Sequence, residues 1–248
     1  MNLEEYNKIF IPGWAIATSE YKNFVENLSI SYLRNIEVAN FGYFNEISSE
    51  NELNLSLDDA AQQVSDYVGD NETILFCHSL GSVFGLQASL LNENIKTVVV
   101  FSGFGKFAED KDDWKLGQSV RALRAMKMML RKNPERLLED FYANCAQPFK
   151  NKFDIPVEFN GDLLKNGLEL LQIVDIRDIL ATIQVPVLFI HGDKDVICDC
   201  NVAETTTKMM TKSKFAKFSK IVNSGHNLLF DNVDQWQGII SEFFEQIK

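Results

Sequence analysis

The chain has 248 residues, of which 46% are hydrophobic and 24% charged, as in ordinary globular proteins with one large or two small domains. Its formal net charge of −11 argues against nucleic acid as a general partner. No apolar run approaches the roughly 20 residues of a membrane span and the first residues are polar, so we expect no secretory signal and no membrane association. We also expect the protein to be cytoplasmic and monomeric.

Short apolar strands alternate with helical segments over the first hundred residues. Strands are predicted at 8–11, 36–41, 73–76 and 96–101. Helices are predicted at 19–33, from an N-cap at Ser56 to residue 68, and at 82–91. The fourth strand is β-branched and shows little polar alternation, which is typical of strands buried on both faces of a parallel sheet.

This alternation stops after residue 104 and resumes near residue 183. Between these points the sequence predicts only helices, at 118–132, 134–146 and 162–181. Beyond them it predicts a strand at 185–190, a helix at 201–210, a strand at 215–222 and a terminal helix at 234–248.

Strands that alternate with helices predict an α/β fold, a mostly parallel sheet with helices on both faces. We expect residues 1–104 and 183–248 to form this core. Residues 105–182 are expected to form an inserted helical cap over the carboxyl ends of the strands, where such sheets bind ligands.

The stretch Cys77-His78-Ser79-Leu80-Gly81 has the pattern of a nucleophile elbow, a sharp strand-to-helix turn that presents a serine hydroxyl. The usual pattern is G-x-S-x-G, and Cys77 replaces its first glycine. Cysteine is small, so the close approach of strand and helix is expected to survive. We therefore predict Ser79 as the nucleophile, with the backbone N–H of Leu80 directed at the carbonyl under attack.

A serine nucleophile needs a base and a carboxylate that orients the base. Of three histidines, His226 alone follows the last predicted strand, the position of the base in the α/β-hydrolase order of serine, acid and histidine. The alternative for His226 is a loop residue that caps the final helix. Asp195, just past the strand at 185–190, is the predicted acid. Asp193, which can instead serve a turn, is the first alternative, and Asp199 is a more distant one.

A second oxyanion donor is expected from the turn after the first strand, Pro12-Gly13-Trp14-Ala15. We assign it to the backbone N–H of Trp14 and expect the indole to line the acyl pocket; simple core packing is the alternative for this side chain. These parts predict an acyl-enzyme route that needs neither a metal nor an organic cofactor. Cys198 and Cys200 lack the spacing and the second ligand pair of a metal site, so we expect reduced thiols.

A basic run lies in the predicted cap. Residues 115–136 hold seven basic residues and one acid, which leaves a charge of −17 for the rest of the chain. At about 100° per residue, the side chains of Arg121, Arg124, Lys127 and Arg131 fall on one face of a helix. The plain alternative is a solvated face, but such faces usually mix signs. An anionic partner, a small acidic protein rather than DNA, fits this charge pattern.

The chain resembles the pimeloyl-acyl-carrier-protein methyl ester esterases of biotin synthesis, α/β-hydrolases with a helical cap. The matching segments are Ile11-Pro12-Gly13-Trp14, Ser79-Leu80-Gly81, the stretch 166–177, Gly192-x-x-Asp195 and Gly225-His226. Pro12 stands where the family has histidine and Cys77 where it has glycine, and His78 is a further departure. None of these removes a chemical group that the reaction needs.

This resemblance implies that arginines of the cap bind acidic acyl carrier protein while the serine hydrolyses the methyl ester of the attached pimeloyl chain. Arg121, Arg124, Arg131 and Arg136 are the candidates for docking. The alternative is a generalist esterase or thioesterase that acts on small soluble acyl esters. A non-enzymatic binding module is a third hypothesis, which the presence of Ser79, Asp195 and His226 disfavours.

Overall fold

The computed structural model describes residues 4–26, 28, 35–44, 57–111, 113–156 and 158–247. Within them, six strands form one sheet in the order β2-β1-β3-β4-β5-β6, and every neighbouring pair is parallel. The strands are β1 (Asn7–Ile11), β2 (Glu37–Val38), β3 (Thr73–His78), β4 (Ile95–Phe101), β5 (Val187–Gly192) and β6 (Ala216–Ile221). The predicted α/β fold is confirmed.

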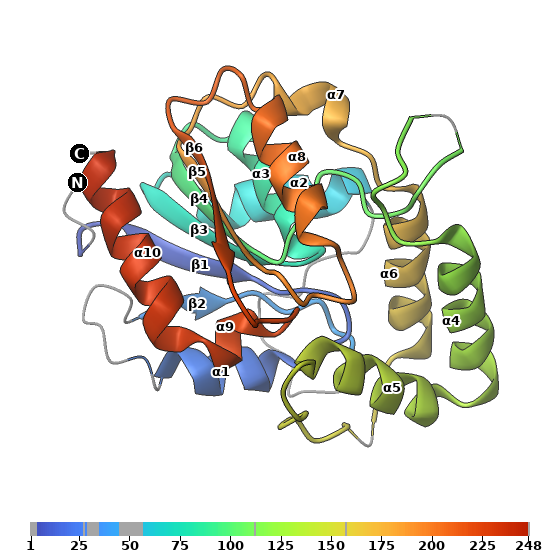
Figure 1. The fold of residues 1–248 in the computed structure, drawn as a ribbon. Coiled ribbons are helices and arrows are strands. Elements are labelled where there is room, and N and C mark those ends of the chain that lie inside the picture. The colour runs from blue at the N-terminus through green and yellow to red at the C-terminus, as the bar shows by residue number, and fades with distance from the viewer. Residues whose placement is uncertain are drawn as a thin grey trace.

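The central strands are apolar because helices cover both faces of the sheet. All residues of β3 and β5 are buried, which explains their lack of polar alternation. Figure 1 shows α1 (Thr18–Glu26) and α10 (Val233–Gln246) on one face. The other face carries α2 (Leu57–Val68), α3 (Gly81–Leu91) and α8 (Cys200–Met209).

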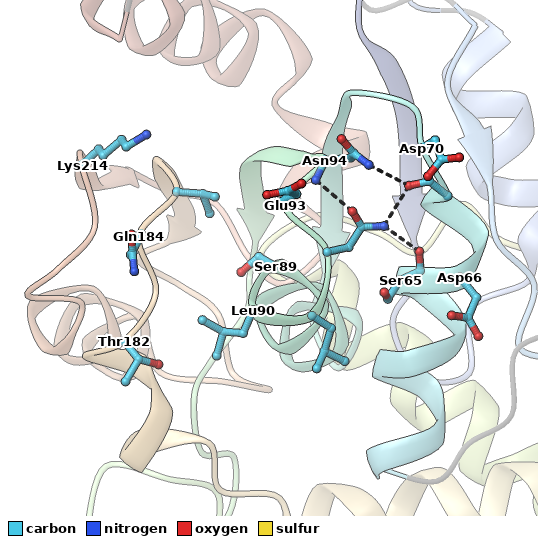
Figure 2. Close-up of a pocket in the computed structure, with 14 residues that line it drawn as sticks. Ser65, Asp66, Asp70, Ser89, Leu90, Glu93, Asn94, Thr182, Gln184 and Lys214 are labelled. Carbon is cyan, nitrogen blue, oxygen red and sulfur yellow. Dashed lines mark hydrogen bonds between the residues drawn. The ribbon is translucent and has the colours of Figure 1, made fainter.

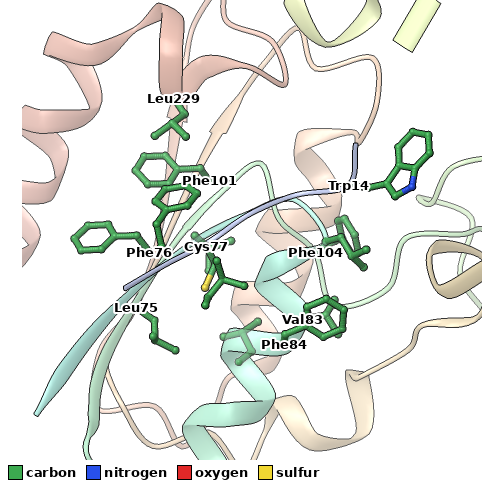
Figure 3. Close-up of a cluster of buried hydrophobic side chains, with 14 of the residues drawn as sticks. Trp14, Leu75, Phe76, Cys77, Val83, Phe84, Phe101, Phe104 and Leu229 are labelled. Carbon is green, nitrogen blue, oxygen red and sulfur yellow. The ribbon is translucent and has the colours of Figure 1, made fainter. Parts of the chain in front are cut away.

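Aromatic side chains fill the space between these layers (Figure 3). Phe101 of β4 packs edge-on against Trp236 of α10 at 5.2 Å between ring centroids. On the other face, the ring centroids of Phe84 in α3 and Phe41 lie 5.5 Å apart, and both side chains are buried. Each such side chain contributes about 1.5–3 kcal/mol by its burial, so packing on both faces stabilises the sheet that carries the site.

Three of the four helices described between β4 and β5 lie to one side of the sheet (Figure 1). They are α4 (Val120–Lys132), α5 (Pro134–Ala146) and α6 (Gly161–Ile173), and the described part of 105–182 adds no strand to the sheet. Each begins at a polar N-cap whose side chain accepts a backbone N–H, namely Ser119, Asn133 and Asn160. We call this segment the α4–α6 insertion.

The expected single helix at 162–181 is wrong, because α6 ends at Ile173 and a separate short helix, α7 (Arg177–Leu180), follows. The chain between them turns back to the start of the insertion. Ile176 donates its N–H to the carbonyl of Gly105 at 2.9 Å, and Lys106 pairs with Asp175. These long-range contacts override the helical periodicity of the sequence.

Other boundaries differ by smaller amounts. The strand expected at 36–41 is limited to β2, and the terminal helix ends at Gln246. The helix expected at 19–33 is seen up to Glu26, and most of its remainder lies outside the described residues, as does the expected N-cap Ser56. A one-turn helix, α9 (Leu228–Asp231), precedes α10. Among the helices described, none is long and apolar enough to cross a membrane.

Candidate active site

Ser79 occupies a tight turn between β3 and α3, with a backbone φ of +50° in the left-handed region. A non-glycine residue there costs on the order of 1–3 kcal/mol, which the surroundings must offset. The N–H of Ser79 donates to the carbonyl of Phe101 at 2.9 Å. Gly81 allows the turn to pack tightly, since a β-carbon at this position would lie 2.4 Å from the carbonyl oxygens of Ile11 and Pro12. The turn has the geometry of a nucleophile elbow.

The three side chains predicted to form a proton relay lie within hydrogen-bonding distance of one another. His226 Nε2 is 3.0 Å from Ser79 Oγ, and His226 Nδ1 is 2.7 Å from Asp195 Oδ2. A carboxylate accepts only, so Nδ1 carries the hydrogen and Nε2 presents its lone pair to the hydroxyl. The arrangement can remove a proton from Ser79 during attack on a carbonyl carbon.

The carboxylate of Asp195 is fully buried and makes four contacts. Its Oδ1 accepts the N–H groups of Ile197 at 2.8 Å and Cys198 at 2.9 Å, and His191 Nε2 lies 3.0 Å from Oδ2. Burial alone would raise the pKa of Asp195, but His226 and His191 hold that pKa well below its ordinary value. The group therefore stays ionised beside His226.

The two alternative acids have other contacts. Asp193 accepts the N–H of Asn223 at 2.6 Å and so closes a turn, while Asp199 caps α8 by accepting the N–H of Asn201 at 2.8 Å. His191, near the end of β5, was not predicted as a site residue, but it contacts Asp195 directly. Its position four residues before Asp195, at a strand end, was the available signal.

The turn with Gly13 and Trp14 packs directly against Ser79. A β-carbon on Gly13 would lie 3.0 Å from that of Ser79, so this turn borders the Ser79 side chain. The structure records no acceptor for the backbone N–H of Trp14 or Leu80 among the residues it describes. Both predicted oxyanion donors are therefore available on the chain segments that flank Ser79.

The Trp14 side chain joins the sheet to the α4–α6 insertion. Its indole N–H donates to the carbonyl of Leu164 in α6 at 2.9 Å, and its ring meets Phe141 of α5 edge-on at 4.8 Å. Trp14 is also part of the wall of a small apolar cavity of about 30 Å³ that reaches Ser79. Other residues that line it are Phe107, Leu123, Met126, Phe141 and Leu171. The space suits an aliphatic group, and a long chain requires these side chains to move.

Comparison with known proteins identifies the family. Residues 42–232 match the model of the family described as serine aminopeptidase, S33. The chain belongs to this hydrolase family. Together with the site geometry, this makes the protein a serine hydrolase of the α/β-hydrolase class.

Relatives of this S33-family hydrolase include two proteins named pimeloyl-[acyl-carrier protein] methyl ester esterase. That of Pseudoalteromonas atlantica is 23% identical over 84% of the chain and 83% of the relative. That of Wigglesworthia glossinidia brevipalpis is 25% identical over 82% and 80%. Among solved structures, an esterase from Exiguobacterium antarcticum superposes with a TM-score of 0.78, at 16% identity, over 96% of this chain and 92% of its own. This last likeness concerns the fold.

The candidate docking arginines of the S33-family hydrolase lie on two helices. Arg121, Arg124 and Arg131 are exposed on α4, and for none of them is an ion pair recorded among the described residues. Met128, on the same face, is 60% exposed. Arg136 on α5 differs, because Glu139 at 3.3 Å and Asp140 at 2.8 Å offset its charge. The positive charge is therefore concentrated on α4.

A broader groove of about 1020 Å³ opens at the other end of the strands from the relay (Figure 2). It lies between the C-terminal ends of α2 and α3 and the segments that precede β4, β5 and β6. Ligand sites of parallel sheets lie at the carboxyl ends of strands, whereas this groove is at their amino ends. It carries acids such as Asp66, Asp70 and Glu93 but no serine–histidine pair, so we assign it no part in the hydrolase reaction.

The cysteines of this hydrolase take no part in the relay. All four are free thiols, and Cys77 lies in β3, two residues before Ser79. Within the described ranges, no three His, Cys, Asp or Glu side chains are grouped as metal ligands.

Proposed function

We propose that this hydrolase is a carboxylesterase that cleaves the methyl ester of a pimeloyl chain attached to acyl carrier protein, through an acyl-enzyme. The observation that carries the proposal is the hydrogen-bonded relay Asp195–His226–Ser79. The relay borders an apolar cavity walled by the α4–α6 insertion, whose α4 helix exposes three arginines. We propose that this insertion acts as a cap.

In the first half of the reaction Ser79 Oγ attacks the ester carbonyl carbon while His226 Nε2 takes the hydroxyl proton. Asp195 stabilises the imidazolium that forms. The N–H groups of Leu80 and Trp14 stabilise the negative oxygen of the tetrahedral intermediate, and each such donor lowers the barrier by about 3–4 kcal/mol. His226 then returns its proton to the departing methoxide oxygen, and methanol leaves.

In the second half a water molecule attacks the acyl-enzyme, and His226 takes one of its protons. Collapse of the new tetrahedral intermediate breaks the bond to Ser79 Oγ, which regains a proton from His226. The product is the free terminal carboxylate, and the enzyme returns to its starting state. No step requires a metal or an organic cofactor.

The exposed arginines of α4 are the reason for proposing an acidic carrier protein as the partner. An acidic protein docked on α4 would face Arg121, Arg124 and Arg131, and the neighbouring Met128 offers an apolar contact. The names of the relatives at 23% and 25% identity support the same substrate class. The remaining negative charge of the chain would repel an acidic carrier elsewhere and so favour docking at this helix.

The experiment is a triple charge reversal, Arg121→Glu, Arg124→Glu and Arg131→Glu. We expect KM for the carrier-bound methyl ester to rise by on the order of tenfold or more, because three favourable charge contacts become repulsive. The kinetics of a small p-nitrophenyl ester should stay unchanged. Arg136→Glu is the matched control, since that arginine already pairs within its own helix. Equal losses on both substrates would remove carrier docking from the proposal.

The second candidate is an esterase or thioesterase for small soluble acyl esters. The cavity of about 30 Å³ at Ser79 favours it, because that space holds only a short acyl group without rearrangement. A panel of p-nitrophenyl esters and acyl thioesters, compared with the carrier-bound methyl ester by kcat/KM, separates the two. A preference for short free esters would support this candidate.

A further inference from the structure

His78, the residue directly before the nucleophile, is buried and has both ring nitrogens engaged. Its Nδ1 lies 2.8 Å from the hydroxyl oxygen of Tyr21 in α1, and its Nε2 lies 3.1 Å from the backbone carbonyl oxygen of His226. The first contact spans 57 residues of sequence and the second spans 148. The side chain therefore links the element that carries the nucleophile to the loop that carries the base.

The direction of each hydrogen bond is fixed by chemistry. A backbone carbonyl only accepts, so Nε2 of His78 must carry the hydrogen. Neutral imidazole then has a bare Nδ1, which accepts from the hydroxyl of Tyr21. The oxygen of Tyr21 in turn accepts the backbone N–H of Gly13 at 3.1 Å. The chain of bonds runs in one direction, from the turn at Gly13 to Tyr21, to His78 and to the backbone of His226.

The imidazole of His78 stays neutral in this arrangement. Burial, with the nearby His226 as a second cause, lowers the pKa of His78 to about 3. The rings of His78 and His226 lie 5.1 Å apart between centroids. When His226 becomes an imidazolium during catalysis, His78 thus adds no second positive charge beside it.

A second side chain holds the same carbonyl of His226. Ser102, at the end of β4, donates its hydroxyl to that oxygen at 2.9 Å and has a backbone φ of +50°. The carbonyl oxygen of His226 therefore accepts two hydrogen bonds, from side chains at the carboxyl ends of the adjacent strands β3 and β4. Backbone strain at Ser102, which persists only when the surroundings enforce it, fits a local constraint at this point.

We propose that Tyr21 and His78 are positioning residues for the hydrolysis, which together fix the turn that carries the Trp14 N–H and the backbone of His226 on either side of Ser79. The inference rests on the catalytic roles proposed for Ser79 and His226, and it is independent of the carrier protein. Neither residue touches the reacting atoms. Their effect is geometric, and a misplacement of about 1 Å at a reacting centre can cost on the order of a hundredfold in rate.

Tyr21→Phe is the sharpest test because it removes one oxygen atom and leaves the ring packing in place. We expect kcat for a small p-nitrophenyl ester to fall on the order of 10- to 100-fold while KM changes little, since the substrate contacts remain. The rate of Ser79 labelling by a fluorophosphonate should fall in parallel, because labelling needs the same activated hydroxyl. Tyr43→Phe is the matched control, as its hydroxyl is buried and, among the residues that the structure describes, has no hydrogen-bond partner; its kinetics should match the wild type.

Two substitutions of His78 test the donor to the carbonyl of His226. Gln presents an amide N–H near the position of Nε2, whereas Leu presents none. We expect kcat of His78→Gln to be several-fold higher than kcat of His78→Leu. Circular dichroism at the assay temperature should show that both variants are folded. If the Leu variant fails to fold, Tyr21→Phe still decides the matter.

A Tyr21→Phe enzyme with wild-type kcat and labelling rate would overturn the positioning role. A loss that follows only the fraction of unfolded protein, measured by thermal melts, would also overturn it. Ser79→Ala and His226→Ala separate the two proposals. Retained activity in those variants refutes the proposed catalytic roles, whereas their inactivity beside a fully active Tyr21→Phe refutes the positioning inference alone.

Discussion

Cys77 and Gly85 face each other across the junction of β3 and α3, where a β-carbon on Gly85 would lie 2.3 Å from the Sγ atom of Cys77. From the sequence alone, the elbow is expected to tolerate cysteine in place of glycine because cysteine is small. The structure gives a further reason, since the helix has no side chain at the point that the thiol occupies. The two positions are complementary in volume.

This pair gives the first prediction. Gly85→Ala should destabilise the protein by about 1–3 kcal/mol through overpacking, although alanine is the better helix former by about 1 kcal/mol. Adding Cys77→Gly should recover much of the loss, which a double-mutant cycle of urea unfolding measures as a favourable coupling. A Gly85→Ala variant as stable as the wild type would mean that the thiol simply rotates away.

The second prediction concerns the contact between α6 and Trp14. A β-carbon on Gly167 would lie 2.3 Å from Cδ1 of Trp14, so Gly167→Ala must displace the indole that walls the cavity beside Ser79. We expect kcat/KM for a small ester to fall about tenfold or more, because the turn that carries the Trp14 N–H moves with the ring.

Gly161→Ala supplies the control on the same helix, since its added β-carbon would meet no atom within 4 Å. That variant should keep wild-type kinetics and gain about 0.4–1 kcal/mol of unfolding free energy through the lower entropy of its unfolded chain. Equal kinetics in the two variants would contradict the role given to Trp14.

The third prediction separates the two aspartates after β5. Asp195→Asn should lower kcat by about 10³- to 10⁴-fold, because an amide at this position no longer fixes the His226 tautomer or stabilises its charged form. Asp193→Asn should stay within a few-fold of the wild type, since an asparagine oxygen can still accept the N–H of Asn223. Steady-state kinetics on a p-nitrophenyl ester measure both; comparable losses would reopen the choice of acid.

The fourth prediction is a pH dependence of stability. The pKa of His78 is lowered from its ordinary value of 6.5 to about 3, mainly by burial and then by His226, with Asp195 opposing and His191 adding to the effect. Below pH 6.5 the unfolded chain binds this proton and the folded protein does not, so falling pH favours unfolding until about pH 3. His78 therefore costs no stability above pH 6.5 and progressively more below it.

Urea unfolding of the wild type and of His78→Gln between pH 7 and pH 4 measures this effect. The wild type should lose stability more steeply, with the slopes differing by up to one proton, or about 1.4 kcal/mol per pH unit. The other titratable groups remain in both proteins, so their contributions cancel in the difference. Parallel curves would show that His78 titrates alike in the folded and unfolded states.

Local patterns in the sequence determined the elements that position the site. The apolar runs of β3 and β5 predict buried parallel strands, and the turn after β3 places a serine at an elbow regardless of what packs around it. The order of Ser79, Asp195 and His226 along the chain then predicts which side chains meet, and their mutual distances agree with that order. These elements can be predicted from sequence because strand burial and turn chemistry depend on a few neighbouring residues.

Only the tertiary structure decided which partners the remaining side chains take. It breaks the expected helix at 162–181 where Asp175 and Ile176 bond to the start of the insertion, and it pairs Arg136 with acids of its own helix. It also joins Tyr21, His78 and the backbone of His226, which are far apart in the chain. Periodicity and spacing do not predict such contacts. The contacts depend on how whole layers pack and on which buried polar atoms find partners between them.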